Sequence, residues 1–221
     1  MLDAESSIAP RGSVEPVVDW RSRRREIVER VTGVYLEKPW QSITIEAVAE
    51  RSGMSFWQVY YSFDGQEDVY RAVAGRLIAN IEAQIDTAPQ CADTVRDTIA
   101  QYIGWLSALF LSVDYRNLAF LKLRDGPSEP WLVINIRRRI RHRLRKALES
   151  RIAGAGGKHG LSIICDSEAI NRALAVLEAN TAFASLASEA KVEDRSVDMA
   201  KAVAVSEIWQ AARTTESAIY A

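Results

Sequence analysis

Apolar side chains recur every three to four residues along most of the chain, and this spacing is typical of helices. One stripe predicts a helix over 24–37, and a second, which runs at four-residue steps from Val69 to Ile85, predicts a longer one. We expect further helices near 92–113, 115–125, 129–153, 166–189 and 195–218. Because no segment alternates polar and apolar residues as a strand does, the fold class is predicted to be all-α.

Two shorter helices are predicted within residues 44–63, TIEAVAERSGMSFWQVYYSF. Thr44 is a suitable N-cap for the first helix, and Gly53 stands where a helix needs a left-handed residue to end. Ser55 and Gln58 have the spacing of a capping box, which predicts the start of the second helix. This order matches the helix-turn-helix pattern. Two adjoining helices of an ordinary bundle would give the same signals, so the flanking residues decide between the interpretations.

The flanking sequence favours the helix-turn-helix. Asp64 and Glu67 form an Asp-x-x-Glu signature that predicts the start of the next helix. The combined pattern is T-x-x-x-V-A-x-x-x-G-M-S-x-x-x-V-Y-x-x-F followed by E-D-V-Y-R-A-V at 67–73. Over about residues 20–80 it resembles the N-terminal domain of the TetR family of bacterial transcriptional regulators. The matching residues before 67–73 are Thr44, Val48, Ala49, Gly53, Met54, Ser55, Val59, Tyr60 and Phe63.

The resemblance implies a division of the chain into three segments. Residues 1–19 are expected to be a flexible tail, and residues 20–80 a three-helix, helix-turn-helix DNA-binding domain. Residues 81–221 are expected to be a helical domain that binds a ligand and dimerises. A dimer is physically reasonable because a two-fold axis pairs two recognition helices on a palindromic duplex operator.

The second helix of the motif, predicted over 55–62, is the expected recognition helix. Val59 and Phe63 are predicted to point inward, and the Gln58 amide can pair with an adenine edge. Phe56 or Trp57 can contact a thymine methyl group. The side chains predicted to be exposed are Phe56, Trp57, Gln58, Tyr61 and Ser62.

Phosphate contacts are expected around this helix. Thr44, at a helix N-terminus, is placed to offer its hydroxyl and backbone N–H to a phosphate. The resemblance implies that Tyr60 and Tyr61 bond phosphates as well, with packing in the core as the alternative for Tyr60. The full predicted DNA-contacting set is Arg24, Arg25, Thr44, Ser55, Phe56, Trp57, Gln58, Tyr60, Tyr61 and Gln66.

Several residues depart from the family pattern. Many members have a small or basic residue and a glycine where Phe56 and Trp57 stand, and a lysine in place of Gln66. Glu46 adds negative charge, and residues 20–85 carry as many acidic as basic side chains. DNA affinity depends on phosphate neutralisation, so these departures predict weaker non-specific binding or a greater dependence on the arginines at 21–25. A solvated helix start is the alternative interpretation of those arginines.

The C-terminal segment is expected to supply the dimer interface and a ligand pocket. Small residues in the last two helices allow close helix packing. The predicted interface residues are Leu174, Leu177, Ala184, Ala204, Ile208 and Ala211. Aromatic side chains can line an apolar cavity for a small hydrophobic molecule, with core packing as the alternative. The predicted pocket residues are Tyr102, Trp105, Phe110, Tyr115, Phe120 and Trp131.

Other chemistry is sparse. The arginine-rich stretch at 137–151 is interpreted as a solvated helix flank with ion pairs, and an anionic ligand site is the alternative. The glycine-rich segment 154–160 lacks the spacing of a phosphate-binding loop and is predicted to connect two helices. The two histidines and two cysteines belong to no metal or catalytic motif, so we expect no cofactor, no metal and no enzyme. No membrane span or secretory signal is evident, which favours a bacterial cytoplasmic protein.

We interpret the sequence as that of a dimeric TetR-like repressor whose operator binding is relieved by a small hydrophobic ligand. Its expected partners are palindromic double-stranded DNA, a small-molecule effector and a second copy of the chain. The alternative is a helical interaction protein that keeps the scaffold, has weakened DNA contact and acts through a protein partner. The net charge of −1 is compatible with either, because only a DNA-facing surface needs to be positive.

Overall fold

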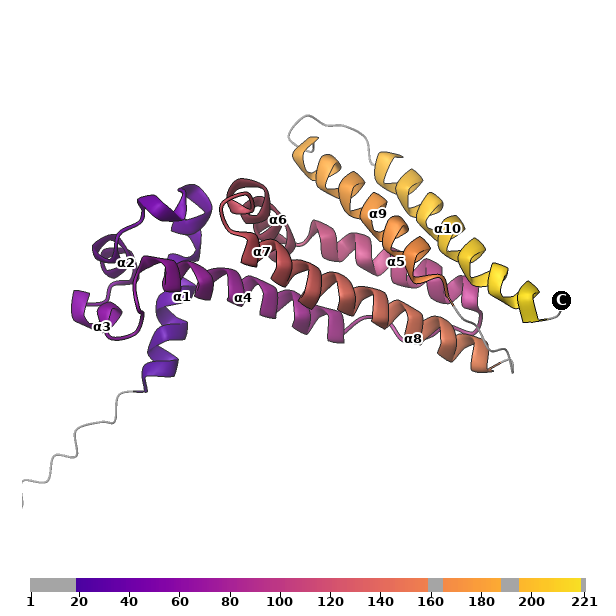
Figure 1. Cartoon of the computed structure of the whole chain (residues 1–221), viewed down its shortest axis with the longest axis horizontal. Helices are drawn as coiled ribbons and strands as arrows, with labels where there is room; N and C mark the ends of the chain where they lie inside the picture. The colour runs from indigo at the N-terminus through magenta and orange to yellow at the C-terminus, as the bar shows by residue number, and fades with distance from the viewer. Residues whose placement is uncertain (1–18, 159–164, 188–194, 220–221) are drawn as a thin grey trace, which may run out of the picture.

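The computed structural model describes residues 19–158, 165–187 and 195–219, and every regular element within these ranges is a helix (Figure 1). The all-α prediction is confirmed. The predicted tail lies outside the described residues, apart from Asp19. The elements are α1 (Trp20–Glu37), η1 (Trp40–Ser42), α2 (Ile45–Ser52), α3 (Phe56–Tyr60), α4 (Gln66–Asp86), α5 (Val95–Leu111), α6 (Val113–Asp125), α7 (Pro130–Asn135), the π-helical turn η2 (Ile136–Arg141), α8 (His142–Lys158), α9 (Ser167–Ala187) and α10 (Arg195–Ile219).

The first helix starts earlier than the apolar stripe predicts. Asp19 caps α1 by accepting the backbone N–H groups of Arg21 and Ser22, at 3.1 and 3.3 Å. A side-chain cap can begin a helix before its first inward-facing residue, so the stripe alone places the start too late. The apolar face of α1 then packs on α4, with Ile27 and Val31 fully buried.

The fourth helix joins the two ends of the molecule. Its stripe from Val69 to Ile85 is buried as predicted, against α1 on one side and α6 and η2 on the other (Figure 1). The predicted Asp64 cap is wrong, because α4 begins after Gly65, which has a φ of 137° and gives no side-chain cap. Asp68 instead accepts the Asp64 backbone N–H at 3.2 Å, so the carboxylate in the first turn holds the incoming chain.

Helices α5, α8, α9 and α10 form the bundle at the other end (Figure 1). The helix predicted over 129–153 is α7, η2 and α8 in succession. A π-helical turn inserts a residue into the helical ladder, which the apolar spacing does not reveal. The glycine-rich segment 154–160 was predicted to connect two helices. Its described part, Gly154 through Lys158, instead belongs to α8, so that prediction is wrong for these residues.

A buried polar joint connects the two ends. Asp125, at the end of α6, is only 3% exposed, and its carboxylate accepts the Tyr70 hydroxyl of α4 at 2.8 Å. Arg124 donates to the same carboxylate at 2.7 Å. It also donates to the backbone carbonyls of Tyr35 and Leu36 in the last turn of α1, at 2.9 and 3.3 Å. One arginine therefore ties α6 to α1 while its neighbouring carboxylate ties α6 to α4.

Candidate nucleic-acid interface

The turn between α2 and α3 has the geometry that the sequence predicts. Thr44 Oγ1 accepts the Ala47 backbone N–H at 3.3 Å and caps α2. Gly53 adopts a left-handed conformation with a φ of 67°, and the Met54 N–H returns to the Ala49 carbonyl at 3.1 Å. Such a glycine ends the helix and turns the chain sharply. The turn therefore directs the next helix away from α2.

The capping box of α3 is present in both directions. The Ser55 Oγ accepts the Gln58 backbone N–H at 3.2 Å, and Gln58 Oε1 accepts the Ser55 backbone N–H at 2.8 Å. The predicted recognition helix is too long, since α3 covers only Phe56–Tyr60. Two of the side chains predicted to be exposed are not: Ser62 is only 9% exposed, with its hydroxyl donating to the Gln58 carbonyl at 2.6 Å, and Gln58 is half-buried because its side chain folds back to the Ser55 N–H. Val59 is buried, as predicted.

Exposed aromatic side chains of α3, of its C-cap and of the first residue of α1 form an aromatic patch, which we define as Trp20, Phe56, Trp57, Tyr60 and Tyr61. Trp57 and Tyr61 are 61% and 67% exposed. Phe56 stacks on Tyr60 with ring centroids 5.8 Å apart, and Trp57 stacks on Tyr61 at 6.0 Å. Core packing of Tyr60 is excluded, because its side chain is 55% exposed.

Arg24 is held within the protein. Its guanidinium makes two hydrogen bonds to Asp68, at 2.8 and 2.7 Å, and a third to the Ser62 carbonyl at 2.7 Å. It also lies 4.2 Å from the centre of the Phe63 ring. Arg24 holds the pKa of Asp68 below its usual value, mainly through these hydrogen bonds. The guanidinium that was expected to contact DNA thus holds α1 to Asp68 of α4 and to Ser62, just after α3.

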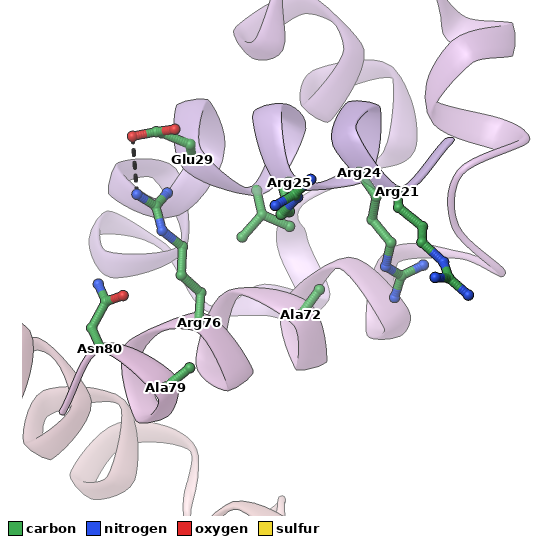
Figure 2. Close-up of a pocket in the computed structure, with 9 residues that line it drawn as sticks. Arg21, Arg24, Arg25, Glu29, Ala72, Arg76, Ala79 and Asn80 are labelled. Carbon is green, nitrogen blue, oxygen red and sulfur yellow. Dashed lines mark hydrogen bonds and ion pairs between the residues drawn. The ribbon is translucent and has the colours of Figure 1, made fainter. Parts of the chain in front are cut away.

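Other arginines of the predicted cluster line a groove between α1 and α4 (Figure 2). Arg21 and Arg25 are exposed at its α1 edge, and the only side-chain bond of Arg25 within the described residues is to Ser22 Oγ, at 2.9 Å. Arg76 of α4 pairs with Glu29 at 3.0 Å. The groove has a volume of about 770 Å³ and an excess of positive charge among its lining residues.

The remaining predicted contact residues surround α3. Thr44 is exposed at the start of α2, Ser55 is exposed and Gln66 is half-buried in the first turn of α4. Glu46, which follows Thr44, is exposed, and the pKa of its carboxyl is lowered, chiefly by a backbone hydrogen bond in the first turn of α2. The structure therefore keeps a negative charge next to the expected Thr44 phosphate contact.

Comparison with known proteins finds no matching family model and no matching curated sequence. Solved structures do match. Salmonella enterica GusR is 13% identical with a TM-score of 0.61, over 88% of this chain and 99% of that one. A TetR/AcrR-family regulator from Thermobifida fusca is 20% identical with a TM-score of 0.54, over 83% and 97%. Bacillus subtilis FadR, solved with stearoyl-CoA, is 17% identical with a TM-score of 0.54, over 83% and 97%. The chain has the fold of TetR-family transcriptional regulators.

In this TetR fold, the residues predicted to line a ligand pocket are dispersed. Tyr102 is fully buried, and its hydroxyl donates to the Leu144 carbonyl at 2.8 Å, while Phe110 and Tyr115 pack against each other in the core. Phe120 is 47% exposed, so it is not part of an interior cavity. Trp105 and Trp131 are half-buried. None of the six lines the groove between α1 and α4 or a second groove along α7 and η2, and the contacts of Tyr102, Phe110 and Tyr115 fit the core-packing alternative.

The predicted dimer residues lie mostly inside the protomer. Leu174, Leu177, Ala204 and Ile208 are buried where α9, α10 and α5 pack together. Ala211 is half-buried, and the Ala184 side chain lies outside the described residues. The apolar stripe of each helix thus packs within its own bundle, and among the described side chains of α9 and α10 the exposed large apolar residues are Val176, Met199 and Val203.

The arginine-rich stretch is mostly ion-paired, as the favoured interpretation states. Arg139 pairs with Glu82 at 2.5 Å, Arg143 with Asp86 at 2.6 Å, and Arg145 with Glu149 at 3.0 Å. Arg151 donates to the carbonyls of Pro89 and Ala88 instead. Within the described residues, Arg137 and Arg138 make no ion pair, and they line a second groove of about 510 Å³ with Ile134 and His142.

Sequence analysis missed one polar cluster inside the bundle domain. Glu178 of α9 bonds to Arg141 and to the buried Tyr115, and lies 3.8 Å from Lys122. Burial, with Glu178 adding to it, raises the pKa of the Tyr115 hydroxyl well above its ordinary value. These residues come from three elements, α6, η2 and α9, that are far apart in sequence, so no local signal identifies the cluster.

No described helix is apolar over enough of its length to cross a membrane. In the same part of the chain, no group of histidine, cysteine and acidic side chains has an arrangement that could hold a metal ion. Burial raises the pKa of the Cys165 thiol to about 11, so this thiol stays protonated at neutral pH.

Proposed function

We propose that this protein is a TetR-type transcriptional regulator that binds duplex DNA through α2 and α3. The observation that carries the proposal is the α2–α3 unit, in which a left-handed glycine ends one helix and a capping box starts the next. Helix α3 lies at one end of the molecule (Figure 1), and its side chains Phe56, Trp57 and Tyr60 are exposed, so a DNA duplex can reach them. Matched structures that are named as transcriptional regulators support this assignment.

We infer that the phosphate contacts come from residues around α3. The hydroxyls of Tyr60 and Tyr61 are on exposed side chains, and Thr44 offers its hydroxyl at the start of α2. Arg21 and Arg25 supply positive charge in the first turns of α1, whose first residue, Trp20, has its ring centroid 6.4 Å from that of Tyr61. Phosphate contacts of this kind fix the position of a protein on DNA without reading its sequence. Arg24 is left out of this set because Asp68 and Ser62 occupy its guanidinium.

The regulator is proposed to act as a homodimer. One five-residue recognition helix reads too short a site, whereas a two-fold axis places two of them on a palindrome. The outer faces of α9 and α10 present Val176, Met199 and Val203, apolar residues that a partner copy would cover. We infer that these faces, rather than the buried stripes, form the interface.

The proposed activity is repression that a small apolar effector relieves. FadR, which has the same fold, was solved with stearoyl-CoA, and this supports an acyl-type effector for the bundle domain. The joint of Tyr70, Asp125 and Arg124 connects that domain to α1 and α4, so a shift of α6 would move the DNA-binding end. Stearoyl-CoA is a direct probe: it should raise the unfolding temperature and release DNA. Unchanged unfolding and unchanged DNA binding would argue against this effector class.

The experiment for DNA binding is selection of bound duplexes from a random pool, followed by binding measurements on the selected sequence. The proposal predicts a palindromic site that is bound more tightly than random duplex. A Ser55→Ala, Gln58→Ala variant removes both halves of the capping box and should lose this preference. Its matched control is Thr94→Ala, which removes the cap of α5 outside the motif.

A second candidate function is supported by one observation. The aromatic patch carries no basic side chain on α3, and exposed aromatic clusters are common in protein–protein interfaces. A protein that uses this surface for a protein partner would show no duplex binding even in low salt. The selection experiment therefore distinguishes the two functions.

A further inference from the structure

The hydrogen-bonding groups of α3 are largely occupied by the helix itself. Gln58 Oε1 accepts the Ser55 N–H, and Ser55 Oγ accepts the Gln58 N–H. Ser62 is buried with its hydroxyl on the Gln58 carbonyl. A glutamine reads adenine by accepting from N6 while donating to N7, so it needs both its oxygen and its nitrogen. Within the capping box, each side-chain oxygen already accepts one backbone N–H, which fixes the orientation of Gln58 toward Ser55 and leaves its amide less free to turn to a base edge.

The surface that remains is apolar and ordered. Phe56 and Trp57 meet edge to face with centroids 5.5 Å apart, and each stacks on the tyrosine four residues later. Trp20 of α1 extends the patch at 6.4 Å from Tyr61. Rings that brace each other lose little conformational freedom on binding. Phe56 and Trp57 stand in the first turn of α3, the part of a recognition helix that contacts base edges.

We propose that α3 selects DNA mainly through the 5-methyl groups of thymine, with Phe56 and Trp57 as the contacting side chains. The inference rests on the proposed DNA-binding function and specifies what its surface recognises. Thymine is the one ordinary base with a methyl group in the major groove, and apolar side chains contact it there. The patch matches that chemistry better than it matches the donor and acceptor pattern of guanine or adenine.

The expected size of the effect follows from burying one methyl group. Removing one buried carbon costs about 0.8 kcal/mol, which corresponds to about a fourfold rise in Kd. A palindrome presents each contact twice, so losing one methyl contact in both half-sites should raise Kd by about sixteenfold. Loss of a phosphate contact would instead weaken binding to all sequences alike.

The experiment uses the full-length protein and its selected duplex, in which each thymine is replaced in turn by deoxyuridine. This change deletes the methyl group and keeps the Watson–Crick pair. We expect at least one position in each half-site at which the symmetric replacement weakens binding by about tenfold or more. Replacement by 5-bromodeoxyuridine, which fills the space of the methyl group, should restore affinity.

Protein variants locate the contact. Phe56→Ala and Trp57→Ala should each bind more weakly, and at least one should bind the thymine and deoxyuridine duplexes equally. Leu123→Ala is the control, since Leu123 is 74% exposed on α6, away from α3, and its variant should keep the full difference. Tight binding with no loss at any deoxyuridine position would overturn the methyl proposal and leave the proposed function standing. Failure to bind any duplex would overturn both.

Discussion

Replacing Tyr70 by phenylalanine tests the joint between the two ends of the molecule. The change deletes one hydroxyl and leaves the ring, which is fully buried and lies among Tyr35, Trp40 and Trp131. That hydroxyl donates to the Asp125 carboxylate at 2.8 Å. The pKa of Tyr70 is raised, first by burial and then by Asp125, so the hydroxyl is protonated and can donate at any ordinary pH.

The magnitude follows from the charge of the acceptor. A hydrogen bond to a charged group contributes about 1.5–3 kcal/mol, and one between neutral groups about 0.5–1.5 kcal/mol. Tyr102→Phe is a matched control, because Tyr102 is also fully buried and its hydroxyl donates at the same 2.8 Å, but to the neutral Leu144 carbonyl. We therefore expect Tyr70→Phe to lower the free energy of unfolding by about 2 kcal/mol, and Tyr102→Phe by about 1 kcal/mol.

The assay is urea unfolding followed by circular dichroism, with all proteins at one concentration because a dimer's stability depends on it. The denaturation midpoint should shift while the slope stays constant. Equal losses for the two variants, or a larger loss for Tyr102→Phe, would refute the assignment of Asp125 as a charged acceptor in the joint.

Three further predictions concern the turn, the arginine clamp and the dimer. Gly53→Ala should lower the free energy of unfolding by about 1–2 kcal/mol, because the φ of Gly53 is 67°. The control Gly75→Ala, in α4, should raise it by about 0.5–1 kcal/mol, because no atom lies within 4 Å of the added carbon. Equal effects of the two variants in urea unfolding would contradict this. Because the folded pKa of Asp68 is lowered, its pair with Arg24 stabilises the protein above the unfolded value near 3.8 and loses this contribution as pH falls through the lowered pKa. Arg24→Gln should therefore cost up to about 1 kcal/mol more at pH 7 than in strong acid, where only its contacts with Ser62 and Phe63 are lost, and a cost independent of pH would count against the pair. Val203→Arg should convert the dimer to monomer in sedimentation analysis, and an unchanged dimer would remove the outer face of α10 from the interface.

The helix-turn-helix could be predicted from the sequence because its signals are local. The Thr44 cap, the left-handed Gly53 and the Ser55–Gln58 capping box each involve residues within one turn of a helix, and the structure contains all three. The Asp64 cap is predicted from an equally local signature and is wrong, because α4 begins after Gly65 and the carboxylate of Asp68, rather than that of Glu67, accepts the Asp64 backbone N–H. A short-range signature predicts a helix start well only where no second side chain satisfies the same group.

The long-range features could not be predicted in this way. Arg24 looked like part of a basic arm, yet its partners Asp68 and Ser62 come from segments that only the tertiary fold brings near. Apolar periodicity correctly placed Leu177 and Ile208 on inward faces of α9 and α10. Periodicity does not distinguish a residue in the protomer core from one in a dimer interface, because an apolar stripe is buried in both cases. For the same reason, it does not distinguish a filled core from a ligand pocket.

Salt titration of binding to the selected duplex is the most direct measurement of the central claim, that the outward face of α3 and its surroundings bind DNA. Counterion release makes log K fall linearly with log salt, with a slope of about −0.9 for each phosphate that a cationic side chain neutralises. If Arg21 and Arg25 each neutralise one phosphate in both subunits of the proposed dimer, we predict a slope of about −3.6, and a slope shallower by about 2 for Arg25→Gln. Absence of duplex binding in low salt, or binding that does not change with salt, would contradict the account.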